Sequence, residues 1–186
     1  MDTALLLIDI QNDYFPGGNM ELSGSVEASL RAREVLDLFR KKAMPVIHVR
    51  HLSVRPGATF FVPGTPGAEI HENVAPLSTE TVIEKNYPNS FRATPLRAIL
   101  EKEAITRLVI AGMMTHMCVD ATTRAAFDCG FACTLVHDAC ATRQLAFGGE
   151  TVPAAHVQSA FLAALNGLYA RIVSAGEFIS QQSGDK

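Results

Sequence analysis

Apolar segments without hydrophobic alternation constrain the fold of this chain more than any other feature of its sequence. Residues 3–10 read TALLLIDI, and similar segments follow at 45–50 (PVIHVR), 108–111 (LVIA) and 131–137 (FACTLVH). A strand that is apolar on both faces is typical of a parallel sheet covered by helices on both sides. Helical patterns at 25–42, 94–103, 115–129, 152–168 and 175–180 separate the strands, of which two more are expected at 81–84 and 168–174. This alternation predicts an α/β domain with a parallel sheet.

Length and charge place the chain among ordinary globular proteins. With 186 residues and a net charge of −3 it is expected to form one domain, residues 1–186, with a frayed polar tail at 181–186. No Lys/Arg run indicates nucleic acid, and no segment has the length and apolarity of a membrane span. The N-terminus lacks the positive region of a signal peptide, which favours a cytoplasmic protein.

The cysteines are confined to one short part of the chain. Cys118, Cys129, Cys133 and Cys140 form a poor framework of disulfides for a whole domain. A metal pair of Cys129 and Cys133 is an alternative, but no second pair of ligands lies nearby.

Residues 107–129 (RLVIAGMMTHMCVDATTRAAFDC) predict a buried strand, a turn at Gly112 and a helix. Thr115 is a suitable N-cap, and it would place Cys118 in the first helical turn. The positive end of the helix dipole is expected to lower the pKa of a thiol there and to favour a nucleophilic thiolate. The alternative is that Cys118 is simply one more small buried side chain.

Two other predicted strand ends carry ionisable residues, Asp9 and Lys85. The carboxyl ends of parallel strands meet at one edge, where ligands bind in open α/β sheets. Asp9 is suited to accept the proton of Cys118, and Lys85 to stabilise both negative partners. Separately, each has a simpler interpretation: Asp9 as the cap of its own turn, and Lys85 as a solvated surface residue.

A long loop at 51–80 is expected to form a lid or a pocket wall, because structureless loops beyond about 15 residues are uncommon in compact domains. Phe60 and Phe61 are its candidate pocket residues, and anchoring of the loop to the core is the alternative role for both.

The sequence resembles the isochorismatase-like cysteine hydrolases, which include nicotinamidases and other amidohydrolases. The similar segments are LLLIDIQNDYF, GTPGAEIH, VIEKNYPNSFRATPL, LVIAGMMTHMCVDATTRAAFDCGF and VHDACAT. The resemblance implies a Rossmann-like three-layer sandwich with about six parallel strands in the order 3-2-1-4-5-6. It also implies a catalytic triad of Asp9, Lys85 and Cys118 and a homodimer or homotetramer.

The resemblance further implies a cis peptide bond between Met113 and Met114, with an oxyanion hole formed by the backbone N–H groups of Met114 and Cys118. The expected reaction is hydrolysis of a small amide without a cofactor. An ester or vinyl-ether hydrolase is the alternative on the same scaffold, and a non-enzymatic binding protein that keeps the fold is the other. Residues near the strand ends are expected to shape the substrate pocket: Gln11, Phe15, Tyr87, Phe91 and His116.

The nicotinamidases carry a metal site with an Asp-x-His motif after the second strand. Here that region reads His48-Val49-Arg50-His51, without the aspartate. His48, His51 and His71 are the remaining candidate ligands. Because side chains alternate along a strand, His48 and His51 can share a metal only if the strand ends at or before Arg50. The sequence therefore predicts no metal.

Overall fold

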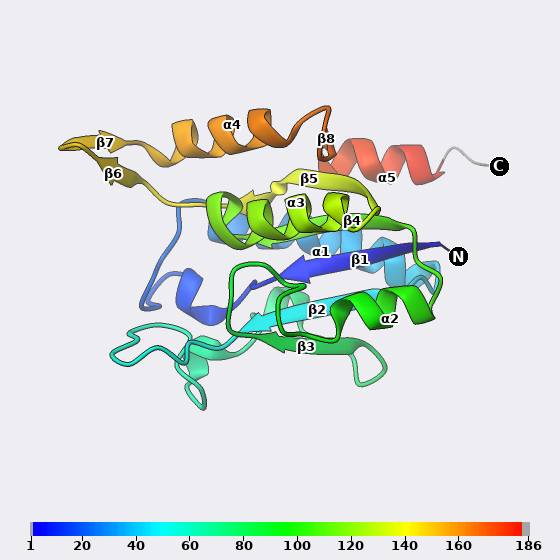
Figure 1. The fold of residues 1–186 in the computed structure, drawn as a ribbon, viewed down its shortest axis with the longest axis horizontal. Coiled ribbons are helices and arrows are strands. Elements are labelled where there is room, and N and C mark those ends of the chain that lie inside the picture. The colour runs from blue at the N-terminus through cyan, green and yellow to red at the C-terminus, as the bar shows by residue number, and fades with distance from the viewer. Residues whose placement is uncertain (1, 184–186) are drawn as a thin grey trace.

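A six-stranded parallel sheet forms the centre of the computed structural model, which describes residues 2–183. Its strands are β1 (Thr3–Ile8), β2 (Val46–His51), β3 (Thr81–Lys85), β4 (Arg107–Met113), β5 (Ala132–Ala141) and β8 (Arg171–Val173). They lie in the order β3-β2-β1-β4-β5-β8, and each neighbouring pair is parallel. The predicted order 3-2-1-4-5-6 is confirmed, with β8 as the sixth strand (Figure 1).

Helices cover both faces of this sheet. They are α1 (Ser25–Lys41), α2 (Leu96–Lys102), α3 (Asp120–Asp128), α4 (Ala154–Leu165) and α5 (Ala175–Ser183). The side chains of β1 alternate between the two cores. Leu5 and Leu7 pack in the core that contains α1 and α5, while Leu6 and Ile8 pack in the core that contains α2, α3 and α4. This alternation of directions between two apolar layers explains why the strand is apolar at every position.

A two-stranded hairpin before α4 was not predicted from the sequence. It consists of β6 (Leu145–Phe147) and β7 (Glu150–Val152), which pair antiparallel. Gly148 and Gly149 connect the strands, and both have positive φ, as the favoured two-residue hairpin turns require. The helix predicted from residue 152 therefore begins only after Pro153. The hairpin projects from the body of the molecule (Figure 1).

The end of the chain also differs from the prediction. Helix α5 continues to Ser183, three residues beyond its predicted end at residue 180. The rest of the predicted tail, residues 184–186, lies outside the described part of the chain.

The long loop after β2 is anchored to the end of β1 by a buried amide. The Gln11 side chain donates hydrogen bonds to the carbonyl groups of His51 (2.9 Å) and Ala68 (2.8 Å). Its own carbonyl oxygen accepts one from the backbone N–H of His51 at 2.7 Å. Two short 3₁₀ turns, η2 (Pro66–Ala68) and η3 (Glu72–Val74), give the loop its only regular structure among the described residues.

A buried carboxylate provides a second anchor for this loop. Asp13 lies in the 3₁₀ turn η1 (Asn12–Tyr14) and accepts a hydrogen bond from the backbone N–H of Phe61 at 2.5 Å. Gly67 packs so closely on Asp13 that a Cβ atom would lie 2.2 Å from its Oδ1. The position of the loop is thus set by contacts between residues about 50 positions apart in the sequence.

Candidate active site

The carboxyl ends of β1 and β3 hold the first two predicted site residues. Asp9 directly follows β1 and has a left-handed backbone with φ of +52°. Such a conformation costs about 1–2 kcal/mol in a residue other than glycine, and aspartate tolerates it better than most. The Asp9 N–H donates to the carbonyl of Val49 on β2 at 3.0 Å, so its backbone is held while its side chain turns toward the sheet edge. Lys85 is the last residue of β3 and pairs in register with His51.

The Lys85 ammonium joins the predicted triad. Its Nζ lies 2.7 Å from Asp9 Oδ2, 3.2 Å from Cys118 Sγ and 2.9 Å from His51 Nδ1. Asp9, Lys85 and Cys118 are all buried. Three ammonium hydrogens thus meet three acceptors, and Lys85 is not a solvated surface residue. The sequence-based expectation that these three residues converge is met in the structure.

Lys85 carries a positive charge at neutral pH. Its burial disfavours the charged form, but the Asp9 carboxylate and the Cys118 sulfur together outweigh that cost and raise the pKa of Lys85. Asp9 Oδ1 is buried and has no hydrogen-bond partner among the described residues. One oxygen of Asp9 therefore pairs with the ammonium, and the other is free to accept a proton.

Cys118 differs from the prediction in its protonation. Burial, followed by the negative charge of Asp9, raises the pKa of the Cys118 thiol, and the opposing effect of Lys85 is smaller. The expected decrease from the helix dipole is therefore wrong, because burial disfavours the thiolate more strongly. Cys118 rests as a thiol and needs a base before it can act as a nucleophile.

The local structure around Cys118 is a π-helical turn, η4 (Thr115–Val119), which leads into α3. The turn is closed by a hydrogen bond from the N–H of Val119 to the Met114 carbonyl at 3.2 Å. Thr115 is not the N-cap, since its hydroxyl donates to the Ala141 carbonyl of β5. Met114 takes the N-cap position instead, and its side chain makes no capping hydrogen bond.

The peptide bond between Met113 and Met114 is cis. The preceding Gly112 has φ of +143°, and a Cβ atom there would lie 2.1 Å from the carbonyl oxygen of Ile8. Only glycine permits this close approach of β4 to β1 immediately before the cysteine turn.

His51 contacts the triad, which the sequence did not reveal. Burial, together with the charges of Lys85 and Arg55, lowers the pKa of His51 to about 4 against the opposing effect of Asp9. The ring is thus neutral at pH 7. Because its Nδ1 accepts a hydrogen bond from the Lys85 ammonium, its proton resides on Nε2. The signal that could have found it is its place at the end of β2, in register with Lys85.

The three histidines considered as metal ligands do not converge. Strand β2 continues through His51, so His48 and His51 project to opposite faces. His48 instead pairs with Glu80 at 2.9 Å, and His71 stacks on Phe15 with ring centroids 3.6 Å apart. These residues therefore do not fit the metal site of the nicotinamidases.

A second possible ligand set combines two triad residues with His51. Ligand atoms of Asp9, His51 and Cys118 lie within 4.8 Å of one another. The Lys85 ammonium already contacts all three residues, so a metal ion would have to displace a buried, protonated lysine. The Lys85 ammonium thus already supplies the positive charge that a metal ion would bring to these residues.

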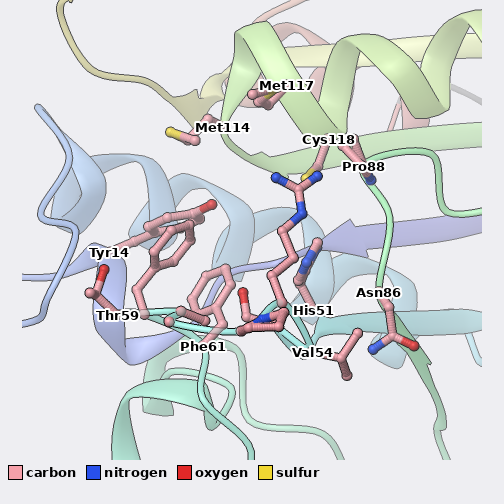
Figure 2. Close-up of a pocket in the computed structure, with 16 residues that line it drawn as sticks. Tyr14, His51, Val54, Thr59, Phe61, Asn86, Pro88, Met114, Met117 and Cys118 are labelled. Carbon is pink, nitrogen blue, oxygen red and sulfur yellow. The ribbon is translucent and has the colours of Figure 1, made fainter.

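Cys118 opens onto a cavity of about 310 Å³ between η4 and the long loop. Figure 2 shows Met114, Met117 and Cys118 on one side and Tyr14, His51 and Phe61 on the other. Phe60 and Phe61 both line the cavity, and Phe61 is also fully buried, so its pocket role and its anchoring role hold together. The lining is mainly apolar, as in most small-molecule sites.

The five residues expected to shape this pocket do not line it. Gln11 is committed to the loop carbonyls, and Phe15 is covered by His71. Both are buried away from the cavity by contacts that hold the loop.

The other three predicted pocket residues are also held elsewhere. Tyr87 is 37% exposed with the Arg92 guanidinium 3.8 Å from its ring centroid. Phe91 packs on Phe131 beside the core. His116 forms a hydrogen bond between its Nδ1 and Thr142 Oγ1 at 2.6 Å. These residues lie close to Lys85 or Cys118 in the sequence. Sequence proximity does not fix the direction of a side chain, and all three point elsewhere.

The site thus combines a thiol, a free carboxylate oxygen and a buried cation beside an apolar cavity, which is a usable set for nucleophilic hydrolysis. A family model described as the isochorismatase domain matches residues 3–173. The chain belongs to the isochorismatase family of hydrolases.

Individual relatives agree with this assignment. The isochorismatase family protein YddQ of Bacillus subtilis is 50% identical over 179 residues, which cover 96% of this chain and 99% of YddQ. The crystal structure of an isochorismatase hydrolase from Oleispira antarctica matches this fold with a TM-score of 0.93 and 50% sequence identity, and the match covers 96% of each chain. Nicotinamidase 3 of Arabidopsis thaliana is 28% identical over 151 residues, covering 75% of this chain and 73% of that protein.

Proposed function

We propose that this protein hydrolyses the C–N bond of a small amide through an acyl-thioester on Cys118. The observation that carries the proposal is the Lys85 ammonium, which joins Asp9 and Cys118 in a buried cluster at the end of an apolar cavity. The name of the nicotinamidase relative, an amide hydrolase, supports the same bond type.

In the proposed acylation step, Asp9 accepts the proton of the Cys118 thiol and the sulfur attacks the amide carbonyl. The raised pKa of Cys118 makes this base necessary. The backbone N–H groups of Met114 and Cys118 are proposed to stabilise the negative oxygen that develops. Lys85 remains protonated and offsets the negative charge that passes between carboxylate and sulfur.

The remaining steps return the enzyme to its resting state. Asp9 passes the proton to the departing nitrogen, and the C–N bond breaks to leave an acyl-thioester and ammonia or an amine. Asp9 then takes a proton from water, the resulting hydroxide attacks the thioester, and the Cys118 sulfur regains the proton as the acid leaves. One amide and one water thus give one acid and one amine.

Cleavage of an ester or a vinyl ether on the same scaffold is the alternative activity, and a binding protein that has kept the fold is the non-enzymatic one. A panel of small primary amides, matched esters and vinyl ethers separates the three by ammonia, alcohol or carbonyl release. Ammonia release is the expected result, and no turnover of any compound would favour the binding protein.

The Cys118→Ala variant tests the proposal at the site itself. We expect it to lower ammonia release about 1,000-fold or more while the circular dichroism spectrum stays unchanged. The matched control is Cys129→Ala, which removes a free thiol that is not among the residues lining the cavity. Substantial turnover by Cys118→Ala would contradict the proposed mechanism.

We propose a homodimer or homotetramer in the cytoplasm, with a small molecule as the only substrate and no membrane or nucleic acid as partner. Within residues 2–183, no helix has the length and apolarity to cross a membrane. Light scattering on the purified protein tests the assembly.

A further inference from the structure

The cavity beside Cys118 has one charged residue in its lining, Arg55. It follows β2 on the long loop, four positions after His51. No aspartate or glutamate of the described residues lines the same space. Arg55 is exposed, and its charge is close enough to lower the pKa of His51.

Arg55 differs from most other arginines in lacking a partner in the described part of the chain. Arg50, five positions earlier, contacts Glu69 at 2.8 Å and Glu84 at 2.5 Å. Nine of the eleven arginines contact a carboxylate, an amide or an aromatic ring. Among the described residues, Arg55 and Arg143 have no such contact, and Arg143 lines a different hollow. The unpaired guanidinium in the cavity is therefore available to a ligand.

The charges around the cavity make an anion the matching ligand. Asp9 and Lys85 form a buried pair of opposite charge, Cys118 rests as a thiol and His51 is neutral. Arg55 thus leaves the cavity with one uncompensated positive charge. A guanidinium pairs best with the two oxygens of a carboxylate, and the apolar lining strengthens such a pair.

We propose that the substrate is an amide that also carries a carboxylate. Arg55 binds the carboxylate, which directs the amide carbonyl at the other end of the molecule toward Cys118. This inference rests on the proposed amidase function and assigns Arg55 as its specificity-determining residue.

Pairs of compounds that differ only in charge test the assignment. Succinamate is compared with butanamide, and glutaramate with pentanamide, by ammonia release. We expect kcat/KM to be about 10- to 100-fold higher for the acid of each pair. In Arg55→Gln this preference should disappear, because kcat/KM falls about 10- to 100-fold for the acid of each pair and much less for the neutral amide. Arg33→Gln on the exposed face of α1 removes the same charge and should change neither. Equal rates within each pair, or equal losses for both compounds in Arg55→Gln, would overturn the inference.

A binding measurement keeps the inference separate from the amidase proposal. Iodoacetamide labels Cys118, and butyrate or hexanoate should slow this labelling in the wild type, whereas 1-butanol and 1-hexanol at equal concentrations should not. In Arg55→Gln the carboxylate concentration for half-protection should rise about 10-fold. If protection depends on Arg55 but no amide is hydrolysed, the anion site stands and the amidase proposal fails. If carboxylates protect both forms equally or not at all, Arg55 is not an anion site.

Discussion

Two regions of this molecule meet at the cavity, and they are built differently. At the sheet edge, Asp9 and Lys85 at strand ends and Cys118 in η4 are buried and held by hydrogen bonds of 2.7–3.2 Å. Across the cavity, the loop presents Arg55, which has no partner within residues 2–183, and Val54, which is 66% exposed. The difference indicates that chemistry is placed on the rigid sheet edge and recognition on the loop, a division common in α/β enzymes. Substitutions at the edge should change kcat for every substrate, and those in the loop should change KM or selectivity.

Asp9→Asn tests the proposed base at the sheet edge. After Cys118→Ala, it should cause the largest fall in kcat. An amide cannot take the proton of Cys118, whose raised pKa keeps it a thiol, so we expect kcat to fall about 100- to 10,000-fold for all substrates. Asp37→Asn on the exposed face of α1 is the matched control for loss of a carboxylate. A variant whose kcat is within a few-fold of wild type would remove Asp9 from its role as base.

Lys85→Met tests the cation of the edge. Because Lys85 lowers the pKa of Cys118 against burial, its loss should raise that pKa further and slow alkylation of Cys118 at pH 8 about 10- to 100-fold. It also leaves Asp9 buried and unpaired, which should reduce the free energy of unfolding by about 3–5 kcal/mol. Lys102→Met is the control at the exposed end of α2. An unchanged alkylation rate in folded Lys85→Met would contradict this role.

The edge was largely predictable from the sequence, because a parallel sheet brings the residues after its strands together whatever lies between them. The convergence of Asp9, Lys85 and Cys118 follows once the strands before them are correctly predicted. The pKa of Cys118 was predicted in the wrong direction, because its burial depends on residues from the loop and from η4 that periodicity does not place.

The loop was not predictable in the same way. Its position depends on Gln11 and Asp13, whose side chains form hydrogen bonds with backbone groups about 50 residues away. No local sequence pattern predicts those partners. For this reason sequence proximity predicts Phe15, Tyr87 and His116 in the pocket, and it gives no sign that Arg55 and Tyr14 line it.

Asp13→Ala tests the loop with a smaller effect. It leaves the buried N–H of Phe61 without its acceptor, which should cost about 1–3 kcal/mol and loosen the cavity wall. We expect KM to rise about 3- to 10-fold while kcat falls less than 3-fold. Asp37→Ala provides the control on α1. A loss confined to kcat would contradict the separation of loop and edge.

Chelation is expected to have no effect at all. The Lys85 ammonium already binds the three residues that could hold an ion near the cavity, and His48 and His71 are paired elsewhere. Dialysis against a strong chelator should leave the rate unchanged, and metal analysis should find no stoichiometric zinc, iron or manganese. Loss of activity that one added metal restores would contradict this prediction and would make Asp9, His51 and Cys118 the ligands to test.

In the proposed mechanism, Cys118 carries the acyl group during turnover. Acid quenching of the wild type with a saturating amide, followed by mass analysis of the Cys118 peptide, tests it most directly. We expect an added mass equal to the acyl part of the amide on Cys118, absent from Cys118→Ala and not found on Cys129, Cys133 or Cys140. Turnover without any adduct on Cys118, or with the acyl group on another residue, would contradict it.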